Sequence, residues 1–340
     1  MGGKATHPLM IKKALVTGGG GFVGKAVVKK LLERGVETAV LGRHRYPEIH
    51  ALGVEGFVGN ICDSALMERA TEGVDAVFHV AARAGIWGSW QAYYTTNVLG
   101  TEVVVRGCRI NSVPILVYTS TPSVVFNRAD ILGGDEGLPY AAKFLCHYAR
   151  SKVMAEKIVL NANCASLVTC AIRPHLIWGP GDPHLLPRLL ESGRTKTLKR
   201  VGDGSNLVDI SYIDNVADAH ILAAINLAGN GNAAGKPYFI SQGEPVNLWD
   251  WINELFAAMA IDKVQKSISF PIAYRLGGML EMIYKTIRSS KEPKMTRFLA
   301  EQLAKSHYFS IENAKKDLGY QPLISTVEGL RRTKQWLKTR

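Results

Sequence analysis

The chain has 340 residues, and its content of 47% hydrophobic and 21% charged residues is typical of a globular protein. Its formal net charge of +12 indicates either a solvated basic surface or an anionic partner. The basic residues are scattered and form no module interleaved with aromatic residues, so nucleic-acid binding is not expected. The five cysteines have no metal-ligand spacing, and no metal site is predicted.

Residues 1–13 contain no apolar signal core. No stretch of the sequence reaches the ~20 uninterrupted apolar residues that a membrane span needs. We therefore expect a cytoplasmic protein.

Short β-branched runs alternate with helical patterns through the first half of the chain. The predicted strands cover residues 13–17, 37–41, 56–58, 76–80, 115–119 and 167–172. Strands buried on both faces form continuous apolar runs, and their alternation with helices is typical of a doubly wound parallel sheet. The prediction is an α/β protein with a Rossmann-type sheet.

The character of the sequence changes after Pro174. Asp214 is the predicted cap of a helix that runs through residues 217–228. A strand at 238–240 is expected to return to the sheet, and the chain from Val246 onward is predicted to be mainly helical.

These patterns predict two units that are interleaved in sequence. Residues 1–175, with the return strand near 237–243, form the expected nucleotide-binding domain. Residues 176–340 form a smaller, mainly helical C-terminal lobe that is expected to bind substrate.

A glycine-rich turn follows the first predicted strand and opens into a helix at Val23. Gly18, Gly21 and Gly24 are three residues apart, a GxxGxxG pattern. The first glycine permits the turn, the second permits a phosphate to approach the backbone, and the third permits the helix to close onto the strand. Backbone N–H groups and the positive helix end then face a pyrophosphate, which indicates a dinucleotide cofactor.

The end of the second predicted strand indicates which dinucleotide binds. An enzyme that uses NAD usually has an acidic residue there, to hold the ribose 2′-hydroxyl. This chain has Arg43 and Arg45 instead, whose guanidinium groups suit the 2′-phosphate of NADP(H). The alternative is that both arginines are exposed loop charges. Asn60 follows the third strand and is expected to meet the adenine.

Tyr148 and Lys152 are four residues apart, so they share one face of a predicted helix. A tyrosine is a weak acid at neutral pH, and a neighbouring ammonium group is expected to lower its pKa. The hydroxyl cluster Thr119–Thr121 ends the preceding strand, where open α/β sheets place their sites. This set predicts acid–base chemistry on a substrate oxygen beside the cofactor.

The order of these motifs resembles the extended short-chain dehydrogenase/reductase family over nearly the whole chain. The matching segments are 17–24, 79–82, 97–101, 118–121, 148–152, 173–174, 179–182 and 212–215. The resemblance implies NADP(H)-dependent oxidoreductase activity, with Tyr148, Lys152, Thr121 and Asn97 as the catalytic set. It implies cofactor contacts from a larger set, which is Gly18, Gly21, Phe22, Val23, Gly24, Arg43, Arg45, Asn60, Ile61, Ala81, Ala82, Lys152 and Pro174.

A second group of motifs resembles the branch of this family that reduces 2-alkyl-3-oxoalkanoates to 2-alkyl-3-hydroxy acids in long-chain olefin biosynthesis. These segments are 84–88, 119–124, 176–182, 201–206 and 297–302. The chain is also similar to the branch of 3β-hydroxysteroid and sterol-4-carboxylate 3-dehydrogenases. Both branches imply a bulky apolar substrate with an oxygen at C3. A nucleotide-sugar epimerase or dehydratase is a third hypothesis, disfavoured by the apolar C-terminal lobe.

Substrate contacts are expected from aromatic and polar residues near the carboxyl ends of the strands. The candidates are Trp87, Trp90, Tyr94, Ser123 and His175. Either Arg173 or His175 is a candidate partner for a substrate carboxylate, although Arg173 has a structural role as the alternative. An apolar stripe with interspersed basic residues over 272–288 has four interpretations: packed core, a substrate lid, a membrane-surface helix or a docking face.

The resemblance also implies partners. Members of the family commonly form homodimers through the helix that carries the Tyr/Lys pair. The olefin branch implies association with the pathway's ligase and hydrolase, and a long-chain apolar β-keto acid as substrate.

Overall fold

The computed structural model describes residues 11–339 and contains a central seven-stranded parallel sheet. Residues 1–10, which carry most of the segment expected to lack a signal core, lie outside this range. The strand order is β12-β7-β5-β4-β1-β2-β3, and every neighbouring pair is parallel. The strands are β1 (Lys13–Thr17), β2 (Glu37–Gly42), β3 (Glu55–Val58), β4 (Ala76–His79), β5 (Ile115–Thr119), β7 (Val168–Pro174) and β12 (Lys236–Ile240). The predicted Rossmann-type sheet is confirmed, including its return strand.

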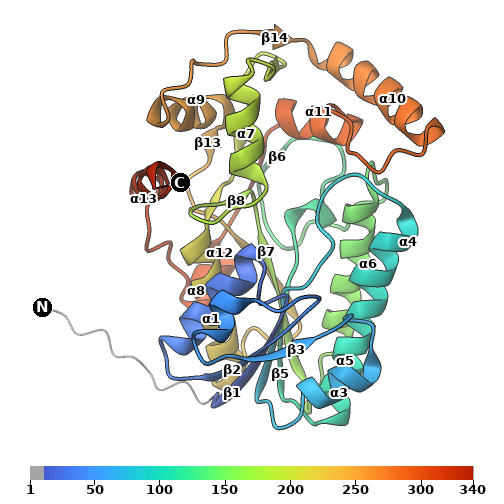
Figure 1. Ribbon diagram of the computed structural model, residues 1–340, viewed down its shortest axis with the longest axis vertical. Helices are drawn as coiled ribbons and strands as arrows, with labels where there is room; N and C mark the ends of the chain where they lie inside the picture. The colour runs from blue at the N-terminus through green and yellow to red at the C-terminus, as the bar shows by residue number, and fades with distance from the viewer. Residues whose placement is uncertain (1–10, 340) are drawn as a thin grey trace, which may run out of the picture.

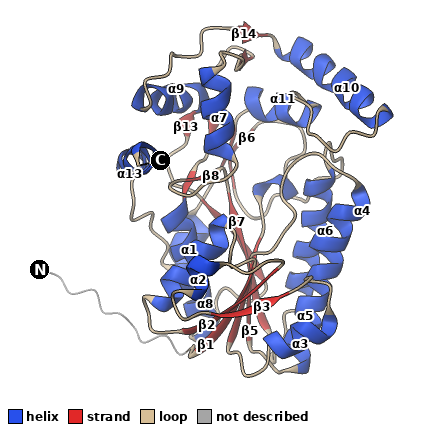
Figure 2. Cartoon of the chain, viewed as in Figure 1, coloured by secondary structure: helices blue, strands red, loops and turns tan. Residues whose placement is uncertain are grey.

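Helices cover both faces of the sheet (Figures 1 and 2). One face packs against α1 (Phe22–Leu32), α8 (Ile213–Ala228) and α12 (Glu312–Leu318), and the other packs against α3 (Ser64–Ala70), α5 (Gly100–Ile110) and α6 (His147–Asn161). The order of winding reverses between β1 and β4, which are neighbours in the sheet. Ligands of open α/β sheets bind at the carboxyl ends of the strands at such a point.

The predicted cap of α8 is wrong. The helix begins at Ile213 with Tyr212 at the capping position, and Asp214 lies inside its first turn. A carboxylate there still interacts favourably with the positive end of the helix, and it forms a 3.5 Å ion pair with Arg332.

The C-terminal lobe is mainly helical, as predicted, and lies above the sheet in Figure 1. Its helices are α7 (Leu185–Arg194), α9 (Leu248–Ala258), α10 (Phe270–Thr286), α11 (Arg297–Ala304) and α13 (Thr326–Lys338). They enclose a second core around Trp178, Tyr212 and Trp251. Within residues 11–339 no helix is both long and apolar enough to cross a membrane.

Several very short strands in and below the lobe escaped prediction. A four-stranded sheet contains β6 (Ile131–Gly134), β10 (Leu207–Val208), β13 (Val246–Asn247) and β15 (His307–Phe309). The remaining short elements are α2 (Pro47–His50), α4 (Trp90–Tyr93), η1 (Tyr94–Leu99), η2 (Pro122–Val124), β8 (Ile177–Trp178), β9 (Arg200–Val201), β11 (Ser211–Tyr212) and β14 (Ser267–Ile268). Because β6 and β12 each join elements from the other half of the sequence, the two units are interwoven.

Candidate active site

The glycine turn between β1 and α1 is closely packed. Gly18 has a φ of +70°, and a Cβ there would lie 2.8 Å from the Cα of Ala81. A Cβ at Gly24 would collide with the carbonyl oxygen of Gly18. The turn is closed by a 2.9 Å hydrogen bond that the Gly21 N–H donates to the same oxygen. This geometry requires glycine at positions 18 and 24, as the spacing predicted.

The N-terminus of α1 presents unpaired N–H groups. Gly21 is the capping residue and supplies no side-chain hydrogen bond, while Phe22 and Val23 begin a first turn that contains no acidic residue. A helix end of this kind suits the diphosphate of a dinucleotide. The residues present therefore fit the cofactor that the motifs imply.

Arg43 and Arg45 are exposed at the end of β2. Among the described residues neither forms an ion pair, so both guanidinium groups are available to an anion.

The contact of Tyr46 with the glycine turn was not predicted from the sequence. Its ring covers the turn so closely that a Cβ at Gly20 would collide with it, and one at Gly42 would lie 2.6 Å away. An aromatic residue in a polar loop gives no periodic signal, so only the fold reveals this contact.

Three further predicted cofactor residues lie near the same end of the sheet. Asn60 is exposed, and its Oδ1 accepts a 3.0 Å hydrogen bond from the N–H of Cys62. Ile61 is buried at 7% exposure, and Ala82 is exposed after β4. Their positions leave Asn60 and Ala82 accessible to a ligand, whereas Ile61 presents little surface.

His79 connects the glycine turn to the neighbouring helix, a role that its motif alone did not reveal. Its ring nitrogens lie 2.8 Å from the hydroxyl of Thr17 and 2.9 Å from that of Thr101. Burial lowers the pKa of His79 to about 3, so the ring is neutral and bridges two hydroxyl groups. Thr17 in turn accepts a 3.2 Å hydrogen bond from the N–H of Ala81.

Tyr148 lies in the first turn of α6 with its phenol next to Thr121. Burial raises the pKa of Tyr148 to about 12, and a hydrogen bond with Thr121 opposes this shift. The expected lowering by the neighbouring ammonium is therefore wrong for the protein alone. Lys152 instead donates a 2.6 Å hydrogen bond from Nζ to the carbonyl of Thr119 and lies 4.2 Å from the ring centroid of Tyr118. Burial lowers its own pKa to about 7.

Thr121 also fixes the short turn that follows it. Its Oγ1 accepts a 3.3 Å hydrogen bond from the N–H of Ser123, and the two hydroxyl oxygens are 3.3 Å apart. The structure thus brings Thr121, Ser123 and Tyr148 together.

Asn97 lies in the π-helical turn η1 and joins two parts of the site. Its Oδ1 accepts a 2.7 Å hydrogen bond from the N–H of Arg83, and its Nδ2 donates at 2.9 Å to the hydroxyl of Ser151. Ser151 then donates at 2.7 Å to the carbonyl of Tyr148. Ser151 was missed because a serine between two motif residues has no pattern of its own. π-Helical turns of this kind are frequent at functional sites.

The residues on either side of Pro174, which ends β7, are buried. Arg173 is 2% exposed and bound by Glu156 at 2.5 and 3.0 Å, which contradicts its expected pairing with a substrate carboxylate. His175 is buried, and its Nε2 lies 2.6 Å from Nδ1 of His307. One of its two ring nitrogens thus has a partner in the interior, and its contact with a substrate stays a prediction.

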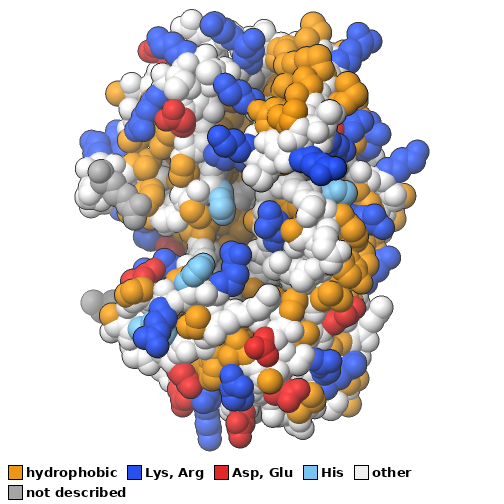
Figure 3. Space-filling view, turned by 45° about the vertical axis from the view of Figure 1, so that its right-hand side comes forward, with side chains coloured by type: hydrophobic (Ala, Val, Ile, Leu, Met, Phe, Trp, Pro, Cys, Tyr) orange, Lys and Arg blue, Asp and Glu red, His pale blue; other side chains and the backbone are white. Residues whose placement is uncertain are grey.

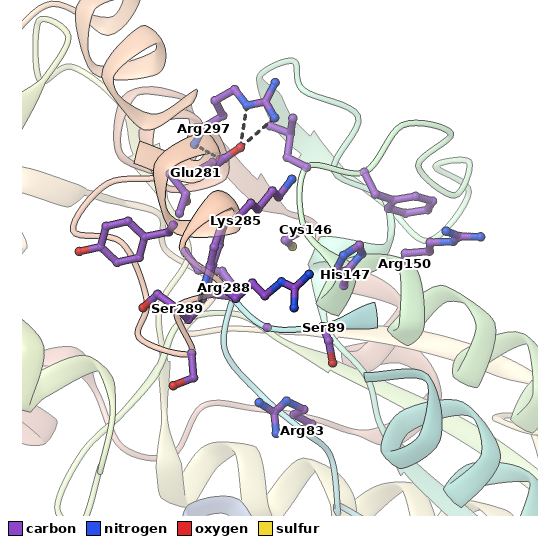
Figure 4. A pocket seen from close by; sticks show the side chains of 18 of the residues that line it. Arg83, Ser89, Cys146, His147, Arg150, Glu281, Lys285, Arg288, Ser289 and Arg297 are labelled. Carbon is purple, nitrogen blue, oxygen red and sulfur yellow. Dashed lines mark hydrogen bonds and ion pairs between the residues drawn. The ribbon is translucent and has the colours of Figure 1, made fainter. Parts of the chain in front are cut away.

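A cavity of about 1110 Å³ opens between the loop after β4, the start of α6 and the end of α10. Figure 3 shows lysine and arginine side chains around the hollow, and Figure 4 shows its lining. Trp87, a predicted substrate residue, lines the cavity, and its Nε1 donates at 3.1 Å to the carbonyl of Ser289. Cys146 and His147, which directly precede Tyr148, form part of the wall. Among the described residues, Tyr148 does not itself line the cavity, but it packs in one apolar cluster with Ile86 and Cys146, which do.

Trp90 and Tyr94 do not line this cavity. Their rings pack together with centroids 5.4 Å apart, and the guanidinium carbon of Arg150 lies 4.3 Å from the Trp90 ring centroid. Both side chains remain partly exposed, so their contact with a substrate stays a prediction.

Comparison with known proteins decides the family. Residues 15–272 match the model of the 3-beta hydroxysteroid dehydrogenase/isomerase family. The chain belongs to this family. It is an oxidoreductase of the extended short-chain dehydrogenase/reductase type, as the motifs predicted.

Three relatives align with nearly the whole chain. A 2-alkyl-3-oxoalkanoate reductase of Stenotrophomonas maltophilia is 49% identical, covering 95% of this chain and 98% of the relative. A protein of the same name from Shewanella oneidensis is 45% identical, covering 95% and 86%. The mouse sterol-4-alpha-carboxylate 3-dehydrogenase is 35% identical, covering 95% and 90%.

Solved structures support the fold. The crystal structure of gox2253 has a TM-score of 0.79 at 26% identity and covers 96% of this chain and 98% of its own. A dTDP-glucose 4,6-dehydratase of Streptomyces venezuelae, solved with NAD and DAU bound, has a TM-score of 0.75 at 23% identity and covers 96% of both chains. The second similarity shows the fold alone.

Proposed function

We propose that the protein reduces the C3 ketone of a 2-alkyl-3-oxoalkanoic acid to the corresponding 3-hydroxy acid, as a step of long-chain olefin biosynthesis. The observation that carries this proposal is the identity of 49% and 45% to two reductases of that name along almost their whole length. The site supports it, since Tyr148 bonds Thr121 and packs in one apolar cluster with Cys146 and Ile86, which line a cavity of about 1110 Å³.

NADP(H) is the proposed cofactor, and when bound it supplies the hydride. The N–H groups of the turn and of the first turn of α1 would hold its diphosphate. Arg43 and Arg45, exposed and without ion-pair partners among the described residues, would bind its 2′-phosphate. The remaining proposed contacts to the cofactor come from Asn60, Ala81, Ala82 and Pro174.

The chain's own groups supply the proton. Thr121 would donate a hydrogen bond to the substrate carbonyl oxygen, and Tyr148 would transfer its phenolic proton to that oxygen as negative charge develops there. Burial raises the pKa of Tyr148 to about 12, so the phenol holds its proton at neutral pH. Lys152 would hold the cofactor ribose and favour the phenolate once the proton has left.

Asn97 is proposed as a supporting member of this set. It already bonds the backbone of Arg83 and the hydroxyl of Ser151, and Ser151 bonds the carbonyl of Tyr148. Asn97 thereby fixes the distance between the loop after β4 and the start of α6.

Replacing Tyr148 by Phe tests the chemical assignment. The variant keeps the ring and loses the proton donor, so turnover should fall by about 100- to 10,000-fold while NADPH affinity stays near the wild-type value. Fluorescence titration with NADPH and a steady-state assay measure both quantities. Turnover retained within tenfold would sink the assignment.

A 3β-hydroxysteroid or sterol-4-carboxylate 3-dehydrogenase is the second candidate. The family model and the 35% identity to the mouse enzyme favour it, and the catalytic groups would be the same. Because the identity to this dehydrogenase is lower than the 49% and 45% to the two reductases, dehydrogenase activity is the less favoured candidate. The epimerase or dehydratase hypothesis rests on similarity of fold alone.

The remaining proposals concern the setting of the enzyme. We propose a cytoplasmic homodimer that associates with the ligase and hydrolase of its pathway, with residues 1–175 binding cofactor and 176–340 binding substrate. Contact with a lipid surface is proposed for α10, which exposes apolar side chains (Figure 3), namely Ile272, Leu276, Met279, Met282, Ile283 and, just after the helix, Ile287.

A further inference from the structure

The cavity beside Tyr148 carries uncompensated positive charge. Among the described residues that line it, Glu281 is the only one with a carboxylate, and it binds Arg297 at 2.8 Å. The remaining lysine and arginine side chains of the lining are Arg83, Arg150, Lys285 and Arg288. In the part of the chain that the structure describes, none of these four has an ion-pair partner. An apolar substrate alone would not require such a lining, whereas an anionic group would be stabilised by it.

The pKa of His147, which also lines the cavity, is affected by these positive charges. His147 lies on the opposite wall from α10 (Figure 4), and burial is the main reason that its pKa is lowered. The charges of Lys285 and Arg150 lower the pKa of His147 further. Two of the cations that line the cavity thus act on His147.

Arg288 occupies a backbone position where glycine is the usual residue. It follows α10 with a φ of +51°, and the N–H of Ser289 donates at 2.9 Å to the carbonyl of Tyr284. This hydrogen bond is typical of a helix end whose left-handed residue is glycine, because a Cβ is strained there. The chain keeps an arginine at this position, and its side chain extends across the cavity toward Cys146 and His147 (Figure 4).

Arg83 is held in the cavity from the other side. Asn97 fixes its backbone through both the N–H and the carbonyl, at 2.7 and 3.2 Å. Its guanidinium carbon lies 5.4 Å from the ring centroid of Tyr93, and the Tyr93 centroid lies 6.5 Å from that of Tyr148. The Tyr93 ring therefore contacts both this guanidinium and the ring of Tyr148.

We propose that Arg83 and Arg288 bind the carboxylate of the substrate and so determine specificity for an acid over a neutral ketone. This inference rests on the proposed function. In a 3-oxo acid one carbon separates the carboxylate from the ketone, so fixing the carboxylate also fixes the carbonyl relative to Tyr148. A guanidinium binds a carboxylate through two parallel hydrogen bonds, which restricts the orientation of the substrate. Lys285 adds charge at the rim.

The test compares a long-chain 2-alkyl-3-hydroxy acid with its methyl ester, both oxidised with NADP⁺. This direction is chosen because the 3-hydroxy acid, unlike a 3-oxo acid, does not lose carbon dioxide readily. The variants are Arg83→Gln, Arg83→Lys and Arg288→Gly, with Lys294→Gln as the control for loss of an exposed charge outside the cavity lining.

For Arg83→Gln and Arg288→Gly the ratio of kcat/KM for the acid to that for the ester should fall about 10- to 100-fold, mainly through KM of the acid. Arg83→Lys should recover part of this ratio, and Lys294→Gln should leave it unchanged. Arg288→Gly removes backbone strain, so its unfolding temperature should equal or exceed that of the wild type. A loss of stability in this variant would contradict the strained position of Arg288.

Two results overturn the inference. If the wild type oxidises the acid and the arginine variants leave the acid-to-ester ratio unchanged, carboxylate binding is excluded while the proposed function stands. If the wild type oxidises neither compound, the proposed function fails and the inference fails with it.

Discussion

Lys152 combines a buried position with a titratable charge. It is 2% exposed, and burial lowers its pKa from the ordinary 10.5 to about 7, although the charge of Glu156 opposes the shift. Between these two pH values the unfolded chain binds the proton more readily than the folded protein does. The contribution of Lys152 therefore makes the protein more stable as pH rises from about 7 toward 10.5, and its destabilising cost is full below about pH 7.

Replacing Lys152 by Met removes this cost. The variant should gain the most stability over wild type at or below about pH 7, and the gain should shrink as pH rises. Urea unfolding of both proteins at a series of pH values measures the difference. A difference that does not depend on pH would show that the lysine is not desolvated in the folded protein.

At the residue scale, Arg43 and Arg45 are the side chains proposed to select NADP(H) over NAD(H). Replacing both by Ala should weaken NADPH binding about 10- to 100-fold, because each charge-assisted contact to a phosphate is lost. NADH binding should change little, since NADH has no 2′-phosphate. Arg109→Ala is a matched control at an exposed position of α5. Equal losses for the two cofactors would contradict NADP(H) specificity.

At the scale of elements, the sequence predicts what is periodic or local. The buried strands and the glycine turn were predicted because apolar runs and glycine spacing are visible in the chain. The raised pKa of Tyr148 was not predicted, because burial causes it and burial is set by the fold. The partners of Arg173 and His175 are likewise set by the fold, since Glu156 and His307 meet them only in space.

The junction of β1 and α1 gives an element-scale prediction. Gly24→Ala should destabilise the protein and abolish cofactor binding, because its Cβ would collide with the carbonyl oxygen of Gly18 and push α1 away from the turn. Lys29→Ala, at an exposed position of the same helix, should change neither property. Thermal unfolding and NADPH titration measure both variants. Normal cofactor affinity in Gly24→Ala would contradict the tight closure of the turn.

At the scale of the whole molecule, the two units depend on each other. The strand β12 pairs with β7 along five residues, and α8 covers one face of the sheet, yet both come from the second half of the sequence. The sequence suggested a boundary at residue 175 because composition changes there. Of the later segments that return to the sheet, the sequence predicted only the return strand.

A fragment of residues 1–175 should therefore fail to fold cooperatively. It would leave β7 without its outer neighbour and expose the apolar face that α8 covers. The full chain should unfold in a cooperative transition under the same conditions. Circular dichroism during urea unfolding compares the two, and a stable, cooperatively unfolding fragment would show that the first unit is independent.

Substrate choice is the central claim, and a direct rate comparison tests it. The purified enzyme is given NADP⁺ with either a long-chain 2-alkyl-3-hydroxy acid or a 3β-hydroxysterol, and kcat/KM is measured for each. The structure and the 49% identity to a 2-alkyl-3-oxoalkanoate reductase predict a clear preference for the hydroxy acid. A preference for the sterol would contradict the proposed function and assign the protein to the steroid branch of its family.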